Sequence, residues 1–190
     1  MGRVPSLPRS LGERARPYGL TRQRTTLSSP AGHSVTIVRM KIELIAVGRL
    51  KKGPFLELFQ DYGKRLKWPL TLIELESRYK SEAQARPDEI RLIAEHLKPE
   101  AYIMALDERG HSLTSRALAQ KIEILQNTGT PLIQCVIGGA NGLDNSIRHR
   151  ADFLMGFGQQ TWPHMLARIM LLEQIYRCQQ ILSGHPYHKD

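Results

Sequence analysis

The sequence has 190 residues, of which 41% are hydrophobic, so it can form one domain with a packed core. Its formal net charge is +9, but residues 1–39 contribute +6 of this because they hold seven Arg and a single acid, Glu13. The rest of the chain is only mildly basic, so charge alone is a weak argument for RNA binding. No apolar run approaches the roughly 18 residues of a membrane span, and we expect a soluble protein.

The first 39 residues differ in composition from everything that follows. They are rich in Arg, Ser, Thr and Pro, and they show too little apolar periodicity to offset the entropy cost of ordering. We expect this segment to be disordered. It reads as a transit peptide, as an RNA-binding arm or, in the interpretation that we favour, as an over-extended start. Met40 immediately precedes the first well-patterned strand, so the folded domain is expected to cover residues 40–190.

Two strands and two helices are predicted in the next part of the chain. Lys41–Val47 and Leu70–Leu75 are apolar runs of strand length, and Trp68-Pro69 ends the helix between them. The polar stretch Glu76–Pro87 predicts a mobile loop. The apolar faces of the two helices consist of Phe55, Leu58, Phe59, Tyr62 and Leu66, and of Ile90, Ile93, Ala94 and Leu97.

Strands and helices continue to alternate beyond residue 100, which predicts an α/β fold with a parallel sheet and helices on both faces. Thr114 or Ser115 can cap the helix whose apolar stripe contains Leu118 and Ile122. The other expected elements are strands at Ala101–Leu106, Leu132–Ile137 and Phe153–Phe157 and a short helix at Leu143–Arg150.

The last predicted helix opens at or beside Pro163, because proline is favoured in a first turn. It carries two apolar stripes at the same spacing, and a helix with two apolar faces must bury both. One stripe can cover the sheet, and we expect the other to pack against a second copy of the chain; the alternative is a central core helix in a monomer. The stripes are Met165, Ile169, Leu172 and Tyr176, and Leu171, Ile175, Cys178 and Leu182.

Cysteine usage adds a prediction about the compartment. Cys135 and Cys178 lie far apart in apolar segments and form no C-x-x-C pair. Such thiols are typical core residues of proteins from reducing compartments. We therefore expect a cytoplasmic protein.

The most informative stretch is Pro131–Gly142, PLIQCVIGGANG. A buried strand ends there in Gly138 and Gly139, with a third glycine at Gly142. Glycine suits places where the backbone must approach a ligand closely or take a positive φ, and ligand loops lie at the carboxyl ends of strands in α/β sheets. The pattern indicates either a ligand loop or a plain tight turn.

Three motifs together resemble one known family. They are Ile137–Gly142, then Thr161-Trp162-Pro163-His164 before the last helix, then His185–Lys189 at the terminus. In this order and at these distances the chain from Met40 to Asp190 resembles the ribosomal RNA large subunit methyltransferase H family of the SPOUT superfamily. The resemblance implies a C-terminal trefoil knot and a homodimer that contacts through the C-terminal helix. It also implies S-adenosylmethionine as methyl donor and N3 of a pseudouridine in 23S rRNA of the assembled ribosome as target.

The resemblance also assigns the cofactor site. The implied cofactor-binding residues lie at the end of the third strand, in the glycine loop and in the loop before the last helix. The departure from the family lies at Gln159-Gln160, where members usually have a more apolar loop. The residues are Leu106, Gly138, Gly139, Gln159, Gln160, Thr161, Trp162, Pro163 and His164.

The nucleophile implied by the resemblance is a weakly acidic imide nitrogen, so the site benefits from a base or from a cation that stabilises an anion. Tyr187, His188 and Lys189 are the candidates on the tail, with Arg177 on the last helix nearby. Tyr187 can stack on a base or simply anchor the tail. Methyl transfer from a sulfonium needs alignment more than Lewis acidity, so no metal is expected.

Other residues keep two interpretations. His164 is either a packed helix-start residue or catalytic, and a solvated helix face is the default for Arg168. The Lys and Arg residues of 49–67 form either a phosphate-positioning patch or a charged helix surface. A non-catalytic ribosome-associated module is the rival function. A dinucleotide-dependent oxidoreductase fits poorly, because no G-x-G-x-x-G follows the first strand.

Overall fold

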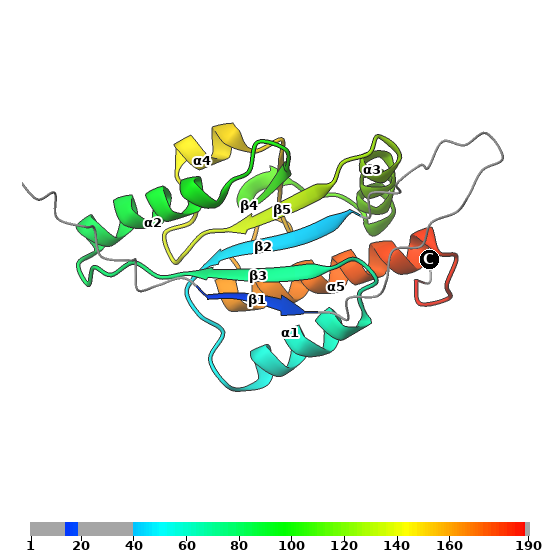
Figure 1. Cartoon of the computed structure of the whole chain (residues 1–190), viewed down its shortest axis with the longest axis horizontal. Helices are drawn as coiled ribbons and strands as arrows, with labels where there is room; N and C mark the ends of the chain where they lie inside the picture. Colours follow the sequence, from blue (N-terminus) through cyan, green and yellow to red (C-terminus); the bar gives the residue numbers. More distant parts are fainter. Residues whose placement is uncertain (1–13, 19–39, 189–190) are drawn as a thin grey trace, which may run out of the picture.

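The computed structural model describes residues 14–18 and 40–188, which form a six-stranded sheet with helices on both faces (Figure 1). The strand order is β1-β3-β2-β5-β4-β6. The five strands from β2 to β6 are mutually parallel, which confirms the predicted α/β class. The strands are β1 (Arg14–Tyr18), β2 (Lys41–Val47), β3 (Leu70–Leu75), β4 (Tyr102–His111), β5 (Leu132–Ile137) and β6 (Phe153–Met155).

Strand β1 is the antiparallel edge of this sheet and pairs Arg14 to Tyr18 with Glu74 to Leu70 of β3. It falls within the segment 1–39 that the composition predicts to be disordered, so that prediction does not hold for these five residues. Backbone pairing with an open strand edge needs no apolar periodicity, which is why composition misses it. The other residues of 1–39 lie outside the described part of the chain.

The helices form two layers. Helices α2 and α4 lie on one side of the sheet, and α1 and α5 lie on the other (Figure 1). Helix α3 packs against α5, as α1 does. The central strand β5 is buried along its whole length, as expected for a parallel strand covered on both faces. The helices are α1 (Pro54–Arg65), α2 (Glu82–His96), α3 (Ser115–Asn127), α4 (Asn145–Arg150) and α5 (His164–Leu182).

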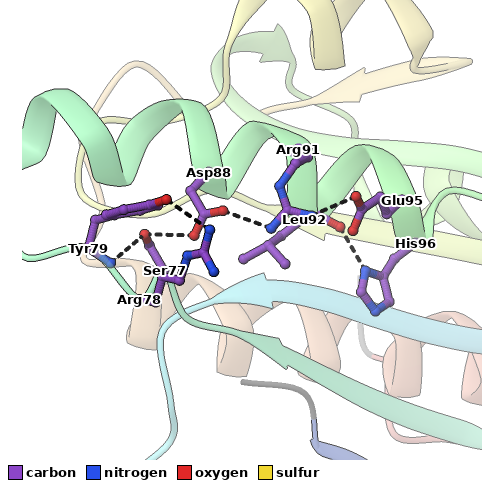
Figure 2. A network of polar contacts seen from close by, with 8 residues as sticks. All are labelled: Ser77, Arg78, Tyr79, Asp88, Arg91, Leu92, Glu95 and His96. Carbon is purple, nitrogen blue, oxygen red and sulfur yellow. Dashed lines mark hydrogen bonds and ion pairs between the residues drawn. The ribbon is translucent and has the colours of Figure 1, made fainter. Parts of the chain in front are cut away.

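Helix α2 begins inside the stretch that the sequence predicts to be a mobile loop. Pro87 lies within the helix, and a polar network anchors this region (Figure 2). Ser77 Oγ donates to Asp88 at 2.9 Å, and Arg91 donates to Asp88 at 2.7 Å. Burial opposes the ionisation of Asp88, but these two hydrogen bonds, the charge of Arg91 and a hydrogen bond from the Arg78 backbone together outweigh it and lower the pKa of the carboxyl group. The loop prediction holds for residues 76–81, which form no helix or strand, and is wrong for residues 82–87, where the helix forms despite the unfavourable helix propensity of proline.

Helix α5 buries both of its apolar stripes within its own chain. Ile169, Leu172 and Ile175 are buried, as are Leu171 and Cys178. The helix lies on the sheet and contacts both α1 and α3, so its own chain covers most of both stripes, with Met165, Tyr176 and Leu182 half-buried. This corrects the physical argument for a dimer, while the dimer itself stays a prediction.

Among the described residues, no helix is long and apolar enough to cross a membrane. The trefoil knot also stays a prediction, since strand order and pairing do not establish it.

Candidate active site

A cleft of about 380 Å³ lies at the carboxyl ends of β4, β5 and β6. This is the edge at which parallel α/β sheets bind ligands. Its walls come from five parts of the chain: the first turns of α2, the end of β4, the loop after β5, helix α4, and the segment from the end of β6 into α5. The lining residues are Arg86, Leu106, Asp107, Glu108, Arg109, Ile137, Gly138, Gly139, Ala140, Asn141, Gly142, Leu143, Arg148, Met155, Phe157, Gln160, Thr161, Trp162, His164 and Ala167.

The glycine loop is a tight turn that also forms one wall of the cleft. A Cβ added at Gly138 would lie 2.7 Å from the backbone C and O of Gly142, closer than real Cβ atoms come. The Gly142 N–H donates to Gly139 O at 3.1 Å, and Gly142 has φ +67°. The loop is therefore a tight turn, and its residues 138–142 also line the cleft. The two interpretations, turn and ligand loop, are compatible.

Strand β4 continues past its predicted end at Leu106 and forms a second wall. This extension packs backbone to backbone against β6, because a Cβ on Gly110 would lie 2.5 Å from the carbonyl carbon of Met155. Asp107, at its base, forms a 2.7 Å ion pair with Arg148 of α4, and both side chains are largely buried. The ion pair ties the strand end to the helix that follows the glycine loop.

The loop before α5 provides most, but not all, of its predicted contacts. Gln160, Thr161, Trp162 and His164 line the cleft, whereas Gln159 and Pro163 do not. The indole N–H of Trp162 donates to Phe157 O at 3.1 Å, and the Thr161 hydroxyl donates to Glu108 at 3.2 Å. The sequence-predicted residues Leu106, Gly138 and Gly139 also line the cleft.

His164 lies at the first turn of α5 and is packed by residues behind the cleft. Gly48, after β2, lies beside the ring: a Cβ there would be in ordinary contact with His164 Nε2, at 3.5 Å, so its φ of +87° rather than a lack of space favours glycine. Burial, followed by the positive charge of Arg168, lowers the pKa of His164 below its ordinary value. At neutral pH the ring is therefore uncharged, with one nitrogen that can donate a hydrogen bond and one that can accept one.

Arg168 is fully buried, which contradicts the default expectation of a solvated face. Its guanidinium donates to the carbonyl oxygens of Val47 and Gly48. Its Nη1 atom lies 3.6 Å from Oε1 of buried Glu74, which also accepts from Leu50 N–H at 2.5 Å. Burial lowers the pKa of Arg168 to about 10, with partial compensation from Glu74. This cluster fixes the end of β2 against the first turns of α5.

The predicted catalytic residues of the tail lie at the opposite end of α5. Arg177 lies 13 residues after His164, about 20 Å along a helix. Its guanidinium pairs with Glu173, lies 4.9 Å from the Tyr187 ring centroid, and has Nη1 3.4 Å from His188 Nδ1. The Tyr187 hydroxyl donates to Glu173 at 3.2 Å. Lys189 lies outside the described residues. Within one chain, the described tail residues Tyr187 and His188 therefore do not line the cleft.

Sequence reasoning missed the charged residues of the cleft. Arg86, Arg109 and Arg148 come from three separate elements, and each looked like an ordinary surface residue. The position of Arg109 three residues after the third predicted strand, Ala101–Leu106, was the available signal, because strand ends meet at this edge. In the described part of the chain, no group of three or more His, Cys, Asp or Glu side chains could hold a metal ion.

Comparison with known proteins agrees with this architecture. The model of the family described as "Predicted SPOUT methyltransferase" matches residues 40–188. Proteins named ribosomal RNA large subunit methyltransferase H are similar to the chain along nearly their whole length. The one from Rhodospirillum centenum is 48% identical over 151 residues, and the one from Zymomonas mobilis is 44% identical over 151 residues. These alignments cover 79% and 80% of this chain and 99% of each relative. The chain therefore belongs to the SPOUT methyltransferase family.

Proposed function

We propose that this protein methylates large-subunit ribosomal RNA with S-adenosylmethionine as the methyl donor, at N3 of a pseudouridine in 23S rRNA of the assembled ribosome. The observation that carries the proposal is the glycine-walled cleft at the strand ends. The chain that forms it aligns with 99% of the length of a relative named ribosomal RNA large subunit methyltransferase H. The finer specificity, for N3 and for pseudouridine, comes from the family resemblance.

The cleft suits a ligand of this kind. Its volume of about 380 Å³ lies in the range of small-molecule sites. Leu106, Ile137 and Met155 supply apolar walls suited to an adenine ring. The close approach of Gly138 to Gly142 leaves main-chain groups where a side chain would otherwise stand. The adenine ring of the cofactor requires both kinds of contact, an apolar wall against its faces and main-chain hydrogen bonds at its edge.

When bound, S-adenosylmethionine supplies an electrophilic methyl group on a sulfonium. The walls of the cleft would hold the donor and fix its orientation toward the target nitrogen. The N3 proton would have to pass to a base for that nitrogen to act as the nucleophile. His188 is our candidate acceptor, while Arg177 and Lys189 stabilise the developing anion.

The distance between the tail and the cleft supports a homodimer. Because the tail lies at the far end of α5 from the cleft, a second copy would have to supply Tyr187, His188 and Lys189 to each site. An exposed apolar surface is available for this contact on α1, where Phe55 and Leu58 are 42% and 45% exposed. The partly buried outer face of α5 adds Leu166 and Met170. We therefore propose a homodimer that buries α5 together with α1.

The activity can be tested with S-adenosylmethionine labelled in its methyl group. The purified protein is incubated with ribosomes from a bacterial strain that lacks the pseudouridine-N3 methyltransferase, and label is counted in separated 23S and 16S rRNA. Label in 23S rRNA alone is the expected result. Ribosomes from the parent strain, whose target is already methylated, are the control. Absence of label in 23S rRNA from the deficient strain would overturn the proposal.

A further inference from the structure

We propose that Arg86 and Arg109 form a phosphate clamp at the mouth of the cleft, which holds the backbone of the ribosomal RNA substrate next to the methyl donor. This inference rests on the proposed function and adds to it the residues that position the RNA. The two side chains come from different elements, α2 and the extension of β4, and both line the same cleft.

Both guanidinium groups are available for a ligand. Arg86 and Arg109 are exposed, and within residues 40–188 neither side chain has a hydrogen bond or an ion pair. The other charged groups of the cleft are already engaged. Arg148 pairs with Asp107, and Glu108 accepts a hydrogen bond from Thr161. The three arginines of the lining outnumber its two acids, Asp107 and Glu108, by one charge. Glu89 and Asp144 interact with Arg86 only electrostatically, so both guanidinium groups keep their hydrogen-bond donors for a phosphate.

The backbone that carries each arginine is anchored. Arg109 is followed by Gly110, whose backbone packs closely against the backbone of Met155 and Gly156 and so holds the β4 extension in place. Its own N–H donates to Asp107 Oδ1 at 3.0 Å. Arg86 lies two residues before Asp88, whose hydrogen bonds to Ser77 and Arg91 anchor the start of α2 (Figure 2). Rigid backbones on both sides suit a clamp better than two flexible loops would.

The size of the cleft determines where the RNA must lie. About 380 Å³ accommodates one small molecule, so a bound cofactor leaves no space inside for a nucleotide and its flanking backbone. The RNA must approach from the mouth. Backbone phosphates there would meet two arginines, whose planar donors match phosphate oxygens bidentately. Such contacts set register and affinity without reading sequence.

The test uses the full chain with Arg86→Gln and Arg109→Gln combined. We expect the KM for ribosomes to rise by roughly tenfold or more. The slope of log KM against log salt concentration should fall in magnitude by about 1.4, because each phosphate contact to single-stranded nucleic acid contributes about 0.7. The kcat and the calorimetric affinity for S-adenosylmethionine should not change. Arg86→Lys with Arg109→Lys keeps both charges and should largely restore the salt slope.

The matched control is Lys41→Gln with Lys80→Gln, which removes the same charge from exposed side chains outside the cleft. An equal rise in KM in this control would mean that net charge alone attracts the RNA, and would overturn the clamp. Weakened cofactor binding with an unchanged KM for ribosomes would also overturn it, since the arginines would then hold the cofactor carboxylate.

A wild-type protein without methyl transfer would instead refute the proposed function. Direct binding of a single-stranded RNA oligonucleotide, followed by fluorescence anisotropy, tests the clamp independently of turnover.

Discussion

Replacing Gly138 by Ala tests whether the glycine loop is built by close backbone contact. The added Cβ would lie 2.7 Å from Gly142 C and O and 3.0 Å from Leu143 N. All three atoms are backbone, so no flexible side chain can move aside. Overpacking of this kind costs about 1–3 kcal/mol of unfolding free energy. In a chain of this size, this corresponds to a fall in Tm of roughly 2–12 °C.

The matched control is Gly142→Asn, because Gly142 needs its positive φ of +67° but has open space where a Cβ would lie. Asparagine tolerates this conformation better than most residues, so the loss should be about 1 kcal/mol or less. Scanning calorimetry gives the stability, and titration calorimetry with the demethylated product of the cofactor gives the affinity. We expect Gly138→Ala to lose affinity by about tenfold or more and Gly142→Asn to lose little. Wild-type stability and affinity in Gly138→Ala would refute the reasoning.

Three further predictions follow from the helix that links the cleft to the tail. Arg168→Met should lower the free energy of unfolding, measured in urea, by roughly 3–5 kcal/mol, because it leaves the buried Glu74 carboxylate without its cationic partner. Adding Glu74→Gln to Arg168→Met should recover part of that loss. If the losses of the two single variants simply add, the two residues do not act as a pair. His164 has a lowered pKa in the folded state, so its contribution to stability is present above about pH 6.5 and is lost as pH falls below that value; unfolding measured between pH 5 and 7.5 should show this slope, and His164→Gln should flatten it. His188→Ala should lower turnover but keep cofactor binding. If each site of a dimer combines the cleft of one chain with the tail of the other, mixing this variant with the Gly138→Ala protein should restore about a quarter of the sites, because half of the dimers are mixed and each has one intact site. No recovery of activity after verified subunit exchange would contradict the shared site.

Local patterns predicted the parts of the fold that depend on one segment at a time. The strands β2, β3 and β5 have the predicted bounds, and Thr114 caps α3 by accepting from Ala117 N–H. Periodicity alone failed at α5. It showed that both apolar stripes must be buried, but it could not show that α1 and α3 would cover them.

The same distinction, between features set by one segment and features set by packing, applies to the residues of the cleft. The glycine loop and Thr161–His164 could be predicted because each is a contiguous motif. Arg86 and Arg148 could not, since they reach the cleft only when α2 and α4 pack beside the strand ends. Buried Arg168 was missed because an arginine in a helix pattern usually faces solvent. Its partners Val47 and Gly48 lie about 120 residues earlier in the chain.

The central claim is methyl transfer to a pseudouridine of large-subunit rRNA. Its most direct test is mass spectrometry of nucleosides from 23S rRNA, after ribosomes lacking the modification have been incubated with this protein and S-adenosylmethionine. Our account predicts a new singly methylated pseudouridine that co-elutes with the N3-methyl standard and forms more slowly with the Gly138→Ala protein when S-adenosylmethionine is limiting. Unchanged pseudouridine, or a methyl group on another nucleoside, would contradict it.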